Sequence, residues 1–384
     1  MIYIGDYSIT HTPQQTVVKI PISIDQDEHI VHFTIHEEIT YTDTASIYNA
    51  ALIGMLPLSF EKEMDIESRN PVCAVLLKNI REELLPTMAA AYETTYIPSI
   101  KAATITMKSS VTEERYATGF SCGVDSLSTL LQTEKEIAYL TFFNAGSHGK
   151  FLQEKTTEIA GFRYSNARKA ASEFGEKLVR VDTNLSEFTK QKFQDNHSFL
   201  QIACVHILHP VINYYSYSTG QKEGYKERYG IDKIYLNNFC VHLLSSSSLT
   251  VDYTLSDISR FERTKIIASS SIAQHYLDVC VDTYEAIKST YQNCSKCDKC
   301  MRTQLTLELL GTYDQFSAVF DKSEYNKHKN KFLAQIKMTR NKDQLNRELY
   351  EEVKKGAYYN FHTLYWELHL KKRLLKKKIK TLFT

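Results

Sequence analysis

The sequence predicts an α/β protein that has a parallel sheet with helices on both faces, a smaller amino-terminal α+β domain and a helical carboxyl-terminal region. Strand-like and helix-like segments alternate from Glu114 onwards, and repeated βα units build parallel sheets that helices cover. The chain of 384 residues has room for two or three domains. We therefore expect domains at residues 1–112, 113–315 and 316–384.

The composition is that of an ordinary folded protein. Hydrophobic residues make up 43% of the chain and charged residues 24%, which excludes a disordered, collagen-like or small disulfide-stapled protein. No apolar run approaches the length of a membrane span. The first residues, MIYIGDYSITHT, lack the basic start and apolar stretch of a secretory signal. These features lead us to expect a cytoplasmic protein.

The first hundred residues are expected to form the small mixed domain. Residue patterns predict strands at Val17–Asp25 and His29–His36, and helices at Ala45–Leu56 and Val72–Leu85. Pro57 is expected in the connection after the first helix, and Pro86 at the end of the second. Strand character resumes at Ser99–Met107. We expect a structural or substrate-shaping role for this domain, because it carries no catalytic constellation.

The second domain is expected to contain the βα units. In chain order we expect a strand at Glu114–Phe120, a helix from about Ser126, a strand at Glu136–Phe143, a helix at Ser165–Gly175, a strand at Leu178–Asp182, a helix at His197–His209 and a strand at Ile231–Phe239. The polar segment Gly220–Gly230 is a candidate lid. Ligands of such sheets bind in the loops at the carboxyl ends of the strands.

The segment SCGVDS, Ser121–Ser126, lies between an expected strand and an expected helix. Backbone amides and hydroxyl groups at such a position can surround an anion at the positive end of the helix. Gly123 permits close backbone approach to a ligand. Asp125 could hold a Mg²⁺ ion that bridges phosphate oxygens, or it could cap the helix. A capped polar turn without a ligand is the simpler alternative.

Half of the cysteines gather in one stretch. Cys294, Cys297 and Cys300 form a C-x2-C-x2-C pattern, and Cys280 lies upstream of it. Two-residue gaps let thiolates converge on one ion, and a fourth thiolate completes the tetrahedron of a structural zinc site. An iron–sulfur cluster is the alternative, although the fourth cysteine followed by proline that is typical of ferredoxins is missing. The other cysteines are scattered, which does not suggest a disulfide framework.

The segment SCGVDS resembles the SGGxDS pattern of the PP-loop ATP pyrophosphatases, with Cys122 where that family usually has glycine. Together with the array of four cysteines, it resembles the 7-cyano-7-deazaguanine synthase (QueC-like) branch with an added amino-terminal domain. The resemblance covers about Val111–Gly311, loosely covers the first 110 residues and does not reach the carboxyl-terminal region.

The resemblance implies an ATP-dependent ligase. Such enzymes cleave ATP between the α and β phosphates, transfer AMP to a substrate oxygen and let a nitrogen or sulfur nucleophile displace AMP. In the QueC-like branch a carboxylate is activated and ammonia converts it to an amide and a nitrile, while zinc is structural. The implied cofactors are ATP, Mg²⁺ and Zn²⁺. The implied nucleotide-binding residues are Ser121, Cys122, Gly123, Val124, Asp125 and Ser126, with Ser147 and His148 from the later segment TFFNAGSHG.

Cationic side chains are expected to assist the same reaction. In the segment RFERTKIIA, Arg263 and Lys265 could neutralise the departing pyrophosphate, so that Asp125, Ser126, Arg263 and Lys265 are the candidate catalytic residues. The alternative is that both cations lie in solvent on a helix surface.

The charge of the chain is unevenly distributed. Residues 321–384 contain 17 Lys and Arg against 7 Asp and Glu, whereas the net charge of the whole chain is only +1. The segment KKRLLKKKIK could contact an anionic partner, or it could be a solvated end helix.

The acceptor substrate is not identified by the sequence, because resemblance in fold does not carry substrate identity. A small molecule, a protein terminus and an RNA all remain candidates, and a homodimer is compatible with the sequence. The alternatives in function are a sulfur-transfer or tRNA-modifying enzyme of the PP-loop type, and a non-catalytic ATP sensor or assembly protein.

Overall fold

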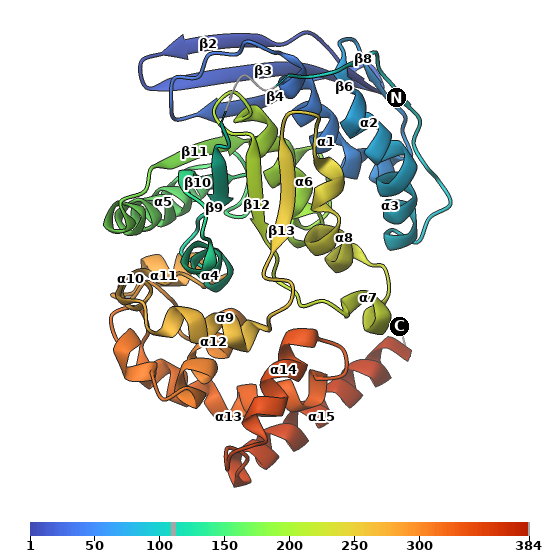
Figure 1. The fold of residues 1–384 in the computed structure, drawn as a ribbon. Coiled ribbons are helices and arrows are strands. Elements are labelled where there is room, and N and C mark those ends of the chain that lie inside the picture. Colours follow the sequence, from blue (N-terminus) through green and yellow to red (C-terminus); the bar gives the residue numbers. More distant parts are fainter. Residues whose placement is uncertain (109–112, 383–384) are drawn as a thin grey trace. The chain divides into compact units, whose positions relative to one another are not determined.

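The computed structural model describes residues 1–108 and 113–382 (Figure 1). The strands are β1 (Ile2–Ile4), β2 (Ser8–Thr12), β3 (Gln15–Ile24), β4 (Asp27–Ile35), β5 (Ile66–Ser68), β6 (Val72–Cys73), β7 (Ile100–Lys101), β8 (Thr104–Ile105), β9 (Tyr116–Gly119), β10 (Ile137–Asn144), β11 (Leu178–Thr183), β12 (Tyr214–Ser218) and β13 (Thr250–Thr254).

The α-helices are α1 (Ala45–Lys62), α2 (Ala74–Asn79), α3 (Leu85–Ala91), α4 (Val124–Gln132), α5 (Glu154–Phe174), α6 (Phe193–Ile207), α7 (Tyr225–Tyr229), α8 (Lys233–Phe239), α9 (Arg260–Ala268), α10 (Ser271–Tyr276), α11 (Thr283–Ile287), α12 (Asp298–Leu309), α13 (Lys322–Thr339), α14 (Gln344–Val353) and α15 (Phe361–Leu382). No helix of the described residues is both long and apolar enough to cross a membrane.

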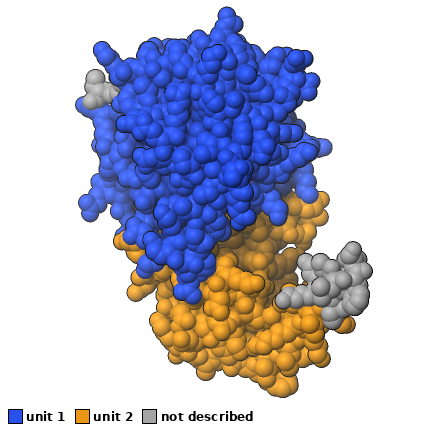
Figure 2. Space-filling model, turned by 90° about the vertical axis from the view of Figure 1, so that its right-hand side faces the viewer, with its two compact units in different colours: residues 1–121, 132–256 blue, residues 122–131, 257–384 orange. Residues whose placement is uncertain are grey.

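The chain forms two compact units, coloured separately in Figure 2. The first unit contains residues 1–121 and 132–256, and the second contains residues 122–131 and 257–384. These boundaries do not coincide with the expected domains, because strands β1 to β5 and β7 join the later strands in one sheet, while β6 and β8 form a separate pair. The second unit combines all of α4 except its last residue with the helices from α9 to α15.

One half of the large sheet in the first unit is parallel. Its strands lie in the order β13, β12, β9, β10, β11, and every neighbouring pair among them is parallel. Along the chain, β10 and β11 are added on one side of β9. The next two strands, β12 and β13, are then added on the other side of β9, so the direction in which strands are added reverses between β9 and β12. A sheet with this reversal binds ligands outside the carboxyl ends of its strands at the point of reversal. The loop that carries SCGVDS follows β9, one of the two strands at that point.

The other half of the sheet is built mainly by the amino-terminal strands. The predicted pairing of the first two long strands is confirmed, because β3 and β4 are antiparallel neighbours from Thr16↔Ile35 to Ile24↔Asp27. β4 also pairs antiparallel with β11, which joins the two halves. The amino-terminal segment therefore extends the parallel sheet directly.

Helices cover both faces of the sheet, as predicted. Successive side chains of a strand point to opposite faces. In β11, Val179 and Val181 belong to the main core, which also contains buried residues of α1 and α6. Arg180 points to the other face, where its guanidinium lies 5.2 Å from the ring centre of Tyr164 in α5. Figure 1 shows α5 and α6 on different sides of the parallel strands.

Several predicted elements were wrong in type or extent. Ile231–Phe239 was expected to be a strand, but Lys233–Phe239 is the helix α8, whose first turn is capped by the Asp232 side chain through the amide of Tyr235. Pro57 lies inside α1, because burial along the whole helix outweighs the lost backbone hydrogen bond. Pro86 lies in the first turn of α3, after a π-helical turn that separates α2 from α3.

Candidate active site and metal centre

The strand, loop and helix around SCGVDS have the predicted order. β9 ends at Gly119 and α4 begins at Val124. Between them, Cys122 has a φ of +58°, in the left-handed region that residues with a side chain rarely adopt. Glycine adopts this conformation without steric cost. Glycine would therefore fit the backbone at position 122 with less steric cost than cysteine.

The Cys122 side chain is fully buried. Burial raises the pKa of its thiol well above the ordinary value, and the negative charge of Asp278 raises the pKa further. The reactive form of cysteine is the thiolate. This environment therefore disfavours a nucleophilic role for Cys122 and fits a small apolar side chain.

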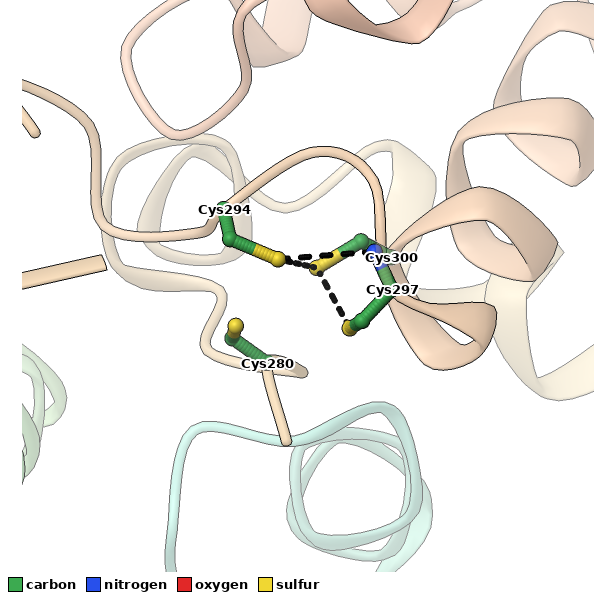
Figure 3. Close-up of side chains that lie close together, drawn as sticks. All are labelled: Cys280, Cys294, Cys297 and Cys300. Carbon is green, nitrogen blue, oxygen red and sulfur yellow. Dashed lines mark hydrogen bonds between the residues drawn. The ribbon is translucent and has the colours of Figure 1, made fainter. Parts of the chain in front are cut away.

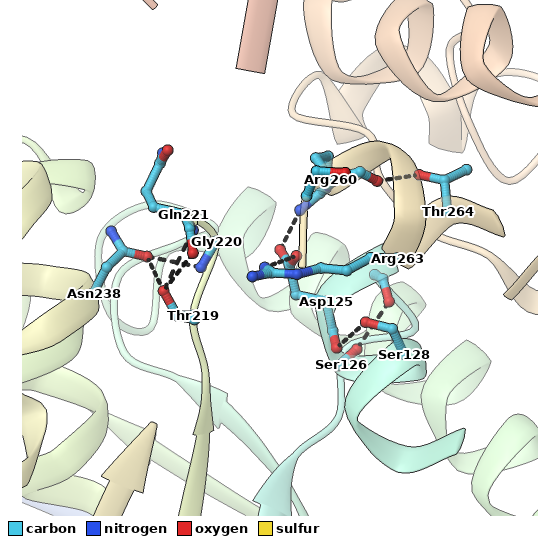
Figure 4. Close-up of polar contacts among 12 residues, drawn as sticks. Asp125, Ser126, Ser128, Thr219, Gly220, Gln221, Asn238, Arg260, Arg263 and Thr264 are labelled. Atoms are coloured by element: carbon cyan, nitrogen blue, oxygen red, sulfur yellow. Dashed lines mark hydrogen bonds and ion pairs between the residues drawn. The ribbon is translucent and has the colours of Figure 1, made fainter. Parts of the chain in front are cut away.

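Asp125, in the first turn of α4, pairs with two arginines of α9 (Figure 4). Arg263 Nη1 lies 3.0 Å from Asp125 Oδ1, and Arg260 Nη1 donates to Oδ2 of the same carboxylate. The guanidinium of Arg263 is fully buried, whereas 14% of the Arg260 side chain and 26% of the Asp125 side chain are exposed. Both arginines belong to the same unit as Asp125.

The two arginines determine the charge state of Asp125. Burial alone would raise the pKa of the Asp125 carboxyl, but Arg260 and Arg263 outweigh burial and hold that pKa below its usual value of 3.8. The group of three side chains is therefore one carboxylate and two guanidiniums, with an excess positive charge at the amino-terminal end of α4. This excess favours an anion.

The same charges oppose the expected role of Asp125 towards Mg²⁺. A divalent cation prefers carboxylates that are not already neutralised by cations. Two guanidiniums at the Asp125 oxygens repel such an ion, so the residues present do not fit Mg²⁺ held by this carboxylate. The structure instead gives Asp125 the task of orienting both arginines.

Arg260 is the functional candidate that the sequence interpretation missed. It lies three residues before Arg263, and residues at this spacing share one face of a helix. Lys265, two residues after Arg263, is exposed and projects from another face of α9. The spacing of the two arginines in RFER was the signal that could have identified Arg260.

The hydroxyl groups of the loop contact local backbone. Ser126 Oγ donates to the carbonyl of Gly123 at 3.2 Å, and Ser128 Oγ donates to the carbonyl of Asp125 at 3.0 Å. These bonds hold the first turn of α4. Ser126 is buried, whereas Ser121 at the start of the segment is exposed.

A second loop at the carboxyl edge of the parallel strands follows β12. Asn238 of α8 holds it, because its Oδ1 accepts hydrogen bonds from Thr219 Oγ1 at 3.0 Å and from the Gly220 amide at 2.7 Å (Figure 4). These contacts lie within the first unit. They fix the start of the segment that was predicted as a lid, Gly220–Gly230, which also contains α7.

Ser147 and His148 lie in the loop after β10, in the first unit. His148 Nδ1 lies 3.1 Å from Asn144 Oδ1 and 3.1 Å from Ser147 Oγ, and the His148 ring stacks on Phe142. Burial lowers the pKa of His148 to about 3, with the positive charges of Arg163 and Arg180 adding to this effect. His148 is therefore neutral at ordinary pH. The expected contact of Ser147 and His148 with a nucleotide stays a prediction.

The four clustered cysteines come together as predicted (Figure 3). The Sγ atoms of Cys280, Cys294, Cys297 and Cys300 all lie within 4.8 Å of one another. Cys300 Sγ is 3.9 Å from Cys294 Sγ and 3.4 Å from Cys297 Sγ. A tetrahedron of Zn–S bonds of about 2.3 Å separates its sulfur atoms by about 3.8 Å. The cluster could therefore hold a metal ion such as zinc.

The chain around the cysteines folds tightly and brings their thiols into mutual hydrogen bonds. Cys297 precedes α12, and the Cys297 amide donates to Cys294 Sγ at 3.4 Å. Ser295, between these cysteines, has a φ of +60°, which turns the chain back sharply. Hydrogen bonds among the thiols, first of all with Cys280, hold the pKa of Cys297 far below its usual range and lower the pKa of Cys294 to about 7. The same hydrogen bonds raise the pKa of Cys280 and of Cys300.

Asn293 connects the two segments that carry the cysteines. Its Nδ2 donates to the Leu277 carbonyl at 2.8 Å, and its Oδ1 accepts from the Val279 amide at 2.9 Å. Next to these residues, the Asp278 amide donates to the Cys122 carbonyl at 2.9 Å. A short stretch of backbone thus links the metal centre to the loop before α4.

Comparisons with protein-family models, with curated proteins and with solved structures found no match for this chain.

Proposed function

We propose that this protein is an ATP-dependent, AMP- and pyrophosphate-forming ligase that adenylates an oxygen of its substrate and then joins nitrogen to it. The observation that carries this proposal is the pair Arg260 and Arg263 at Asp125, in the first turn of the helix that follows SCGVDS. The loop also follows a strand at the reversal point of a parallel sheet, where ligands of such sheets bind.

The phosphates of ATP would bind at the amino-terminal end of α4. Backbone amides there and the two guanidiniums match the charge of a polyphosphate. Asp125 acts as a positioning residue, because its carboxylate fixes both arginines. Arg260 is partly exposed and is therefore the arginine that can reach a ligand, while Arg263 is fully buried.

The proposed reaction has two steps. A substrate oxygen attacks the α-phosphorus, the bond to the β-phosphate oxygen breaks, and pyrophosphate leaves with its electron pair. The arginines stabilise the negative charge that develops on this leaving group. Ammonia then attacks the activated carbon, AMP leaves, and a proton passes from nitrogen to solvent. Catalysis rests on positioning and charge neutralisation.

Cysteine environments favour nitrogen over sulfur transfer. Outside the cluster, the remaining cysteines, which are Cys73, Cys122, Cys204 and Cys240, are all buried. Burial raises the pKa of Cys122 and of Cys204 well above the usual value, and it raises the pKa of Cys240 to about 12. A sulfur carrier needs an accessible thiolate. We therefore assign zinc to the cluster as a structural ion and ammonia as the nucleophile.

The test separates the products of ATP. The purified protein is incubated with ATP, Mg²⁺, ammonia and a pool of cell metabolites, and AMP, ADP and pyrophosphate are resolved. We expect AMP and pyrophosphate in equal amounts. We also expect a loss of about a hundredfold or more in rate for Arg260→Gln, and little change for Arg168→Gln on the exposed side of α5.

Other outcomes would contradict the proposal. ADP and phosphate would mean that the nucleotide is cleaved at the γ-phosphate. Tight ATP binding without any AMP under all supplements would favour a nucleotide sensor. Purification with RNA, together with a steep decrease of RNA binding with salt, would favour a tRNA-modifying enzyme.

A further inference from the structure

Residues 361–376 of the last helix, α15, pack on α13 with one side. On that side, Thr363 Oγ1 donates to Asn330 Oδ1 at 3.3 Å, and Glu367 Oε2 accepts from Lys337 Nζ at 2.7 Å. Asn330 and Lys337 belong to α13. Thr363 and Glu367 are buried, and four residues separate them as expected for one face of a helix.

The opposite side of α15 is an exposed apolar stripe. Its members, which we call the α15 stripe, are each more than half exposed: Phe361, Leu364, Tyr365, Leu368 and Leu375. Their spacing of three, four and seven residues places them along one face. Exposed apolar side chains scattered singly need no explanation, but neighbouring ones on one face mark an interaction surface. Phe361, Leu364, Tyr365 and Leu368 are such neighbours, and the exposed Lys372 lies on the same face between Leu368 and Leu375.

The same helix also carries cationic side chains. Lys371, Lys372, Arg373 and Lys376 are exposed, and Lys371 also pairs with Glu367 at 2.7 Å. The segment Lys371–Lys380 contains seven Lys and Arg and no acidic residue. An apolar stripe and a concentration of cations on one helix form a basic amphipathic helix.

The positive charge of this helix distinguishes between possible binding partners of the α15 stripe. A second copy of this helix would bring two strongly cationic segments together, and like charges oppose such pairing. A nucleic acid would use the cations but would leave the leucines without a partner. The headgroup region of an anionic bilayer provides both negative charge and an apolar layer. No helix of the described residues can cross a bilayer, so contact would be at the surface.

We propose that α15 attaches the protein to anionic lipid surfaces, with the α15 stripe inserted at the headgroup boundary and the cations at the lipid phosphates. Apolar contact supplies attachment, and the cations supply selectivity for anionic lipid. This inference does not depend on the proposed reaction.

The test is flotation of the full-length protein with two kinds of vesicle. One kind contains phosphatidylcholine alone, and the other contains phosphatidylcholine mixed with phosphatidylglycerol. We expect binding to the mixed vesicles only. The double variant L364S/L368S should bind about tenfold or more weakly, and K372S/K376S should bind about twentyfold more weakly. Leu152→Ser, which changes an exposed leucine of the first unit, is the matched control and should bind normally.

Three results would overturn the inference. The first is the absence of binding to mixed vesicles. The second is binding that L364S/L368S leaves unchanged. The third is another use of the exposed side of α15 without any vesicle binding. This would be a dimer in sedimentation that L364S/L368S abolishes, or RNA binding that K372S/K376S abolishes. Because the substituted side chains are exposed, all variants should fold, and their melting temperatures would verify this.

Discussion

The backbone amide of Asp278 donates a hydrogen bond of 2.9 Å to the carbonyl oxygen of Cys122. Cys280 lies two residues after Asp278, and Cys122 lies three residues before Asp125. Both segments belong to the second unit. The segment that carries the cysteine cluster therefore helps to fix the loop that precedes α4, and with it the carboxylate that orients Arg260 and Arg263.

Removal of one cluster cysteine should remove the metal. We expect about one zinc ion per chain in the natural protein, and loss of that ion together with a lower melting temperature in Cys297→Ser, because structural zinc binding contributes folding free energy. Elemental analysis and thermal unfolding measure both effects. Cys240→Ser, a change at a buried cysteine outside the cluster, should keep its zinc. Iron with visible absorbance would instead identify an iron–sulfur cluster.

Removal of the Asp125 charge should destabilise the protein. In Asp125→Asn the buried guanidinium of Arg263 loses a charged partner, and breaking a buried ion pair in this way costs about 3 kcal/mol. Urea unfolding measures the loss. The double variant D125N/R263M should recover part of it, because it removes the uncompensated charge. The single variant Arg263→Met completes the comparison. If the losses of Asp125→Asn and Arg263→Met simply add in the double variant, the two side chains do not interact.

The same pair predicts a dependence on pH. The pKa of Asp125 is lower in the folded state than its usual value of 3.8. A carboxyl with a lowered folded pKa contributes stability that is complete above the unfolded pKa and is lost as the pH falls through the folded pKa. The difference in unfolding free energy between the natural protein and Asp125→Asn should therefore be constant above about pH 5 and decrease below about pH 4. A difference that grows towards low pH would contradict this assignment.

Glycine should be unusually well tolerated at position 122. The positive φ of Cys122 disfavours a side chain by about 1 kcal/mol, so Cys122→Gly should be at least as stable as Cys122→Ala. Cys204, buried inside α6, is the matched control. There, glycine should be about 1 kcal/mol less stable than alanine. The same order at both positions would mean that Cys122 has an ordinary backbone conformation.

Local sequence signals predicted most of the βα order and the cysteine cluster. The cysteines were predictable because ligand spacing is a local property, and the strands β9, β10 and β11 because they are short strand-like segments bounded by polar turns. β12 was not recognised, because YYSYS is not an apolar run, although Tyr215, Ser216 and Tyr217 are all buried. Tertiary packing determines its place in the sheet.

The partners of the candidate site were less predictable. The sequence indicated Arg263 but gave no reason to place it beside Asp125, because 138 residues separate the two. Helix α8 was predicted as a strand from its aromatic and β-branched residues, although Asp232 at its start was a capping signal. Long-range pairings of this kind depend on the fold as a whole.

Turnover of ATP in water enriched in ¹⁸O tests the central claim most directly. If a substrate oxygen attacks the α-phosphorus, the AMP formed with ammonia and the metabolite pool carries no ¹⁸O, since its new oxygen comes from the substrate. Mass spectrometry of AMP and pyrophosphate reads out this result. AMP that contains ¹⁸O would show direct hydrolysis at the α-phosphorus, and ADP with ¹⁸O-labelled phosphate would show cleavage at the γ-phosphate; either result would contradict adenylation.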